Sequence, residues 1–80
     1  MKIQIAGPGC PNCQMTERNV VDACAELDLG ADISHVTNIG EILELGVMRT
    51  PAVVLDGEVL ISGRVPSVAE LRDILERKHA

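Results

Sequence analysis

Two cysteines, Cys10 and Cys13, are the residues of this chain whose type and spacing could do chemistry. They enclose Pro11 and Asn12, at the point where an apolar segment ends and a helical pattern begins. A sulfur at a helix N-terminus faces unpaired backbone N–H groups and the positive end of the helix dipole, and both favour the thiolate. A thiolate with a second thiol one turn further on can attack a disulfide and then be released by its neighbour, which is reversible dithiol–disulfide exchange.

The place of each cysteine relative to the helix predicts its role. Cys10 occupies an N-cap-like position, where its sulfur can accept hydrogen bonds from the amides of Asn12 and Cys13, so Cys10 is the predicted nucleophile. Cys13 lies one turn inside the helix and is the predicted resolving thiol. Pro11 suits the first helical position, where its missing N–H costs nothing. Pro11 and Asn12 are expected to tune the reduction potential, and no cofactor is expected beyond the Cys10–Cys13 disulfide.

The same dithiol could instead hold a soft metal or metalloid ion and pass it on, and this is the alternative function. A zinc site needs four ligands, and the further candidates Cys24, His35 and His79 show no second paired spacing. We therefore assign no metal ligands. Cys24 falls on an apolar helical stripe and is expected to pack as a small hydrophobe.

The segments around the cysteines have strand and helix periodicities. Lys2 to Ala6 alternates polar and apolar residues, which predicts a strand, and Gly7-Pro8-Gly9 ends it. A helix is predicted from Pro11, closing at Gly30. Its predicted buried stripe consists of Cys13, Val20, Val21, Cys24 and Leu27.

A second strand and a short helix are predicted next. The strand runs from Ala31 to Val36. Asn38, with Glu41 three residues later, is typical of a helix N-cap, and the helix should run through Leu45 and end at Gly46.

The last third of the chain predicts a hairpin and a helix. Ala52 to Leu55 and Glu58 to Ile61 flank Asp56-Gly57, a pair that readily takes the positive φ angles of a type I′ turn. Ser67 with Glu70 fits a capping box for the last helix. The predicted apolar face of that helix consists of Val68, Leu71, Ile74 and Leu75.

The predicted order β-α-β-α-β-β-α describes one α/β domain over residues 1–80. A right-handed crossover makes the first two strands parallel, and the hairpin adds two antiparallel strands beside the first. The expected architecture is a four-stranded mixed sheet with helices on both faces.

This order, with Cys10-Pro11-Asn12-Cys13 after the first strand and Thr50-Pro51 before the third, resembles the thioredoxin-like superfamily. Within it, the chain is most similar to small glutaredoxin-sized redox proteins of prokaryotes. The resemblance implies a thioredoxin-like fold in which Pro51 is cis and lies beside the disulfide. It also implies that Thr50 offers backbone groups to an extended substrate. Gly63 either permits close approach of the substrate backbone or only forms the turn after the hairpin.

The resemblance further implies a thiol–disulfide oxidoreductase, an electron carrier that reduces disulfide-containing proteins and is itself reduced by a flavin-dependent thioredoxin reductase. Arg49, beside Thr50, either guides acidic partners or is a solvated charge. A third hypothesis is a non-catalytic domain that interacts through its Thr50-Pro51 edge. The dithiol-exchange hypothesis uses both the cysteine pair and the Thr50-Pro51 edge.

Composition excludes several classes of function. A net charge of −5 and the absence of any basic cluster longer than two residues argue against nucleic-acid binding, and the lack of Phe, Tyr and Trp removes base stacking. No apolar run approaches the length of a membrane span or a signal peptide. A cytoplasmic protein is therefore expected. The chain is also expected to be a monomer.

Overall fold

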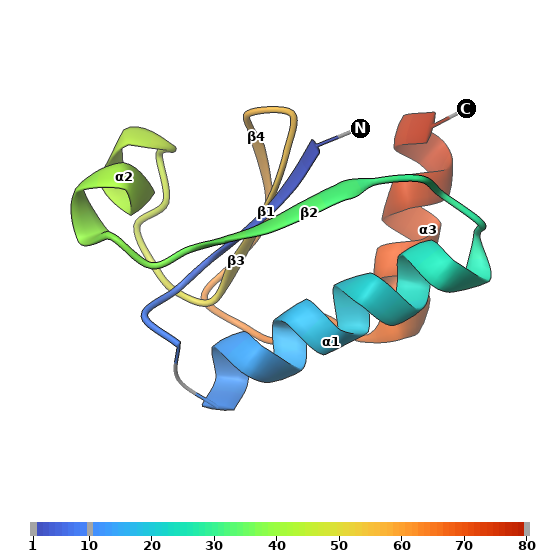
Figure 1. The fold of residues 1–80 in the computed structure, drawn as a ribbon, viewed down its shortest axis with the longest axis horizontal. Coiled ribbons are helices and arrows are strands. Elements are labelled where there is room, and N and C mark those ends of the chain that lie inside the picture. The colour runs from blue at the N-terminus through green and yellow to red at the C-terminus, as the bar shows by residue number, and fades with distance from the viewer. Residues whose placement is uncertain (1, 10, 80) are drawn as a thin grey trace.

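The computed structural model of the protein describes residues 2–9 and 11–79 (Figure 1). The chain forms, in order, β1 (Lys2–Ala6), α1 (Pro11–Glu26), β2 (Asp32–Val36), α2 (Ile39–Glu44), β3 (Ala52–Leu55), β4 (Glu58–Ser62) and α3 (Val68–His79). The predicted α/β element order is thus confirmed.

The four strands form one mixed sheet in the order β2-β1-β3-β4. β1 pairs with β2 in parallel, with Ile3 opposite Ile33, and with β3 antiparallel, with Ile3 opposite Leu55. β3 and β4 form the predicted antiparallel hairpin. Its turn has φ angles of 47° at Asp56 and 87° at Gly57, as a type I′ turn requires. β1, which leads into the cysteine pair, is therefore a central strand.

Alternation along the strands divides the core between the two faces of the sheet. Ile3 and Ile5 of β1 pack in one cluster with residues of α1 and α3. Ala6 belongs to a second cluster with Ile42 of α2 and Val54 of β3. Figure 1 shows α1 and α3 lying together, with α2 apart from them. Helices cover both faces, as predicted.

Local side chains and one glycine fix the ends of the shorter helices. Asn38 caps α2 by accepting a hydrogen bond from the Glu41 N–H at 3.1 Å, and Ser67 Oγ accepts one from the Glu70 N–H at 3.1 Å at the start of α3. α2 ends where Gly46 adopts a φ of 84° and the Val47 N–H donates to the Ile42 carbonyl. The two N-caps and the helix end at Gly46 are confirmed, whereas the Glu70 carboxylate pairs with Arg64 and not with the Ser67 N–H that a full capping box requires.

The prediction that Gly30 closes the first helix is wrong. α1 ends at Glu26, and Asp28 takes the left-handed conformation with a φ of 54°. The N–H of Asp28 donates to Ala25 O at 3.2 Å, and that of Leu29 donates to Cys24 O at 2.9 Å, which together form a Schellman motif. Asp tolerates this conformation better than most non-glycine residues, so the helix ends before the glycine is reached.

The predicted burial of Val21 is also wrong, since this side chain is 46% exposed. Val21 lies about 100° around the helix from buried Val20, beyond the edge of the buried stripe. The buried positions are instead Cys13, Thr16, Val20, Ala23 and Cys24.

Candidate functional site

The candidate site lies where β1 ends and α1 begins. Cys10 lies outside the described residues. Pro11 is the first residue of α1, as predicted, and both it and Asn12 are exposed. Cys13, in the first turn of α1, is completely buried. The thiol predicted to resolve the mixed disulfide therefore faces the interior of the protein.

Gly7 forms the wall against which Cys13 packs. A Cβ atom built on Gly7 would lie 2.2 Å from Cys13 Sγ, a distance that no side chain can accept. The same position is 3.8 Å from the Cβ of Thr50. The Gly7 N–H donates to Val36 O at 2.9 Å, which holds the wall on the end of β2. The absence of a side chain at Gly7 thus brings the sulfur and the Thr50 segment together.

Thr16, one turn after Cys13, is a completely buried polar side chain. Its hydroxyl donates to the Asn12 carbonyl at 2.8 Å, so the buried oxygen is satisfied within the helix. This bond holds the first turn of α1, on which Cys13 is carried.

The Thr50–Pro51 peptide is cis, as the family resemblance implies. Pro51 is buried, whereas Thr50 is exposed beside it. The Gly63 N–H donates to the Pro51 carbonyl at 2.9 Å, and Ser62 Oγ donates to the Arg49 carbonyl at 3.2 Å. The end of β4 therefore holds the segment before β3, and Gly63 lies next to the predicted substrate edge.

An apolar pocket of about 220 Å³ opens beside this edge. Pro8, from the loop after β1, and Thr50 line part of it, and α2 with the loop after it supplies the rest. Three of its residues expose large hydrophobic side chains, namely Ile39 (68%), Leu43 (59%) and Met48 (84%). Its volume is below the range of about 300–1,000 Å³ typical of small-molecule sites.

Comparison with known proteins identifies the family. Residues 1–76 match the model of the thioredoxin domain family. The chain is 45% identical over 75 residues to a thioredoxin of Methanothermobacter thermautotrophicus, covering 94% of this chain and 97% of that protein. It is 42% identical over 74 residues to a thioredoxin of Methanocaldococcus jannaschii, covering 92% and 85% of the two chains. This chain belongs to the thioredoxin family. Like a thioredoxin, it is a thiol–disulfide oxidoreductase.

Neither the thioredoxin relatives nor the structure supports the metal-carrier alternative. Across residues 2–9 and 11–79, no group of three or more His, Cys, Asp or Glu side chains is placed to hold a metal ion. Cys24 is 4% exposed and packs in the aliphatic cluster under α1, as expected for a small hydrophobe. Burial raises the pKa of the Cys24 thiol, so this cysteine resists forming a thiolate.

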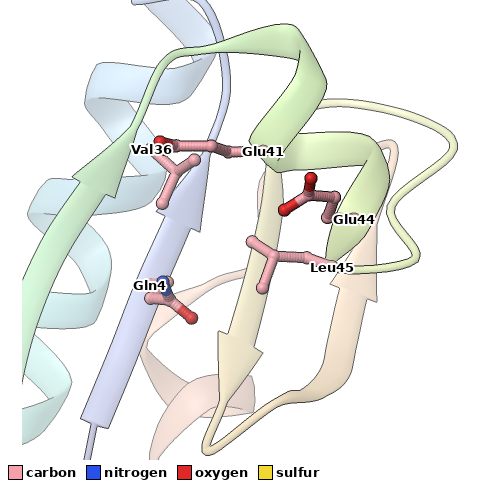
Figure 2. A pocket seen from close by; sticks show the side chains of 5 residues that line it. All are labelled: Gln4, Val36, Glu41, Glu44 and Leu45. Carbon is pink, nitrogen blue, oxygen red and sulfur yellow. The ribbon is translucent and has the colours of Figure 1, made fainter.

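A larger pocket of about 380 Å³ lies on the α2 face of the sheet. Figure 2 shows Gln4 of β1 and Val36 of β2 facing Glu41, Glu44 and Leu45 at α2. The two carboxylates make this surface acidic.

No helix among the described residues is long and apolar enough to cross a membrane.

Sequence reasoning missed three residues that build this thioredoxin site. Gly7 was interpreted only as part of a turn, Thr16 was left off the buried stripe, and Ser62 had no role. The spacing of Thr16, three residues after Cys13, is a helical signal that could have found it. Nothing local distinguishes Gly7 or Ser62, because their contacts are made with distant segments.

Proposed function

We propose that Cys10 and Cys13 carry the exchange reaction. The Cys10 thiolate attacks one sulfur of a substrate disulfide, forming a mixed disulfide and releasing the first substrate thiolate. The Cys13 thiolate then attacks Cys10 Sγ, forming the Cys10–Cys13 disulfide and releasing the second substrate thiolate. Two electrons pass to the substrate, whose two thiolates take up protons from solvent.

The contact of Cys13 Sγ with Gly7, beside Thr50, is the observation that carries this proposal. A substrate chain pairing with the backbone at Thr50 would bring its disulfide to the end of α1. Pro51 and Gly63, joined by a hydrogen bond, would form the base of this docking edge, with the side chain of Arg49 lying against Gly63. Pro11 and Asn12 would set the potential of the dithiol.

We further propose the physiological setting of the reaction. The substrates are disulfide-containing proteins, and a flavin-dependent thioredoxin reductase returns two electrons to the Cys10–Cys13 disulfide. The disulfide serves as the redox group without a further cofactor. Residues 1–80 act as one monomeric domain in the cytoplasm.

Trapping experiments test the two cysteine roles. Cys13→Ser should accumulate mixed disulfides with an oxidised substrate such as insulin, because attack can occur but release cannot. Cys10→Ser should form none, and both variants should lose catalytic insulin reduction. Cys24→Ser is the matched control, and it should retain activity because its thiol lies in the core. Trapping by Cys10→Ser instead of Cys13→Ser would reverse the assigned roles.

A further inference from the structure

Arg49 is a cation placed beside the docking edge. Its carbonyl accepts a hydrogen bond from Ser62 Oγ, and the next residue is Thr50. A Cβ atom built on Gly63 would lie 3.1 Å from both the Cβ and the Cδ of Arg49, so the aliphatic stem of the arginine lies across the glycine. Backbone and stem are therefore held, and the guanidinium extends from a defined point.

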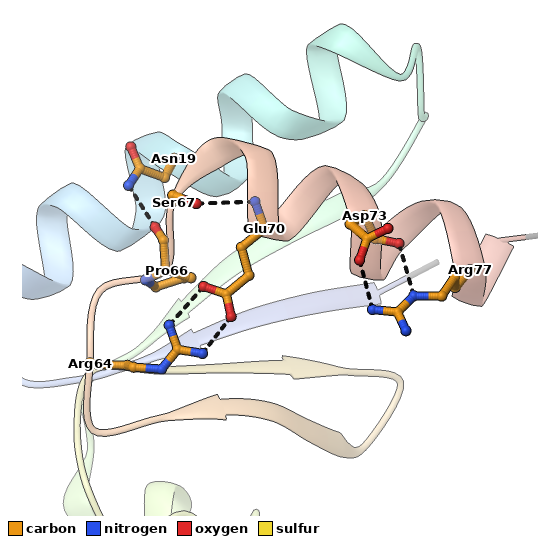
Figure 3. Close-up of polar contacts among 7 residues, drawn as sticks. All are labelled: Asn19, Arg64, Pro66, Ser67, Glu70, Asp73 and Arg77. Atoms are coloured by element: carbon orange, nitrogen blue, oxygen red, sulfur yellow. Dashed lines mark hydrogen bonds and ion pairs between the residues drawn. The ribbon is translucent and has the colours of Figure 1, made fainter.

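The charge of Arg49 is not neutralised within the described residues. Arg64, on the other side of Gly63, is held by both carboxylate oxygens of Glu70 (Figure 3). Arg72, Arg77 and Lys78 also have carboxylate partners. Arg49 has no carboxylate within 4.0 Å in the part of the chain that the structure describes. It is an exposed positive charge on a protein with a net charge of −5.

We propose that Arg49 is a specificity-determining residue that binds a carboxylate of the substrate polypeptide. This inference rests on the proposed function, in which the substrate chain lies along Thr50. An Asp or Glu next to the reacting cysteine of the substrate would then lie within reach of the guanidinium. Without Arg49, the net negative charge of the protein would repel such a substrate. The arginine therefore widens the range of disulfides that the protein reduces.

A pair of matched substrates tests this inference. Each is a peptide with a single cysteine, oxidised to its disulfide dimer, and the two differ only in having Glu or Gln on both sides of the cysteine. The measurement is the second-order rate constant for reduction by the pre-reduced protein, divided by the rate constant with dithiothreitol to remove differences in intrinsic reactivity. The native protein should prefer the Glu peptide by about two- to fivefold at low salt, as expected for one exposed ion pair. The preference should fall to about one in 0.5 M salt, where exposed charges are screened.

Variants assign the preference to Arg49. Arg49→Gln should abolish it, Arg49→Glu should reverse it, and Arg49→Lys should retain part of it. Lys2→Gln is the charge-matched control, because Lys2 is exposed at the opposite end of β1 from Gly7. It should keep the full preference.

Three results would overturn the inference: equal rates for both peptides with the native protein, an unchanged preference in Arg49→Gln, or an equal loss in Lys2→Gln. The last would show that net charge alone selects the substrate. Failure of the proposed function looks different, because neither peptide would then be reduced.

Discussion

Cys13 and Cys24 occupy the two ends of the same helix, and both are almost completely buried. Their surroundings differ. Cys13 packs against the bare backbone of Gly7, beside the exposed Thr50, whereas Cys24 is enclosed by the aliphatic cluster between the sheet, α1 and α3. Burial alone therefore does not separate the proposed resolving thiol, Cys13, from the core thiol, Cys24. What differs is whether the wall around the sulfur is backbone at an edge or side chains in a core.

Gly7→Ala should have the largest effect, because it places a methyl group on the sulfur of Cys13. The φ angle of Gly7 is not in the left-handed region, so the substitution acts through space and not through backbone strain. Overpacking should cost about 1–3 kcal/mol of the free energy of unfolding. A sulfur displaced on the order of 1 Å should slow insulin reduction by roughly 10- to 100-fold.

A double-mutant cycle separates this contact from general damage. In a Cys13→Ala background the destabilisation by Gly7→Ala should shrink by about 1–2 kcal/mol, because the atom in conflict is gone. Gly30→Ala is the matched control, since a Cβ there meets nothing within 4 Å. Equal costs of Gly7→Ala in both backgrounds would show that the wall does not act on the sulfur.

Cys24→Ala should have the opposite pattern, a loss of stability with unchanged exchange. Removing the buried sulfur should lower the free energy of unfolding by about 1 kcal/mol. Cys24→Ser should cost about 1–3 kcal/mol, because it buries a hydroxyl in an apolar cluster. Urea denaturation and the insulin assay measure the two properties. A slower exchange rate in the folded Cys24→Ala protein would break the contrast between the two ends of α1.

The sequence was sufficient to predict this fold because its signals are local. The caps at Asn38 and Ser67 and the turn at Asp56-Gly57 act through residues three or fewer positions away. The exposure of Val21 could also have been predicted, because Val20 lies in phase with Cys13 and Cys24 along the helix and Val21 does not.

The parts of the site that could not be predicted depend on contacts between distant segments. Gly7 meets Thr50 only after β1 and β3 have paired, and Arg49 meets Gly63 only after the hairpin has formed. The spacing of Cys10 and Cys13 predicted the cysteine pair, and the family resemblance implied the cis proline. Neither carried information on which glycine leaves space for the sulfur. That space is a property of packing.

Of these predictions, the one on the pH dependence of the free energy of unfolding has the smallest expected effect. It tests the difference between Cys24 and Cys13 most directly. Burial raises the pKa of Cys24 above its ordinary value of 9.0, so the folded state holds the proton more tightly than the unfolded state. Its contribution is therefore fully present below about pH 9 and is lost as the pH rises through the folded-state pKa. Under reducing conditions, the stability difference between the native protein and Cys24→Ala should be constant from pH 7 to 8 and should decrease above pH 9. The other two thiols are present in both proteins, so their ionisation cancels in the difference. A difference that stays flat through pH 10 would mean that the aliphatic cluster does not disfavour the Cys24 thiolate, and the contrast with Cys13 would then rest on access alone.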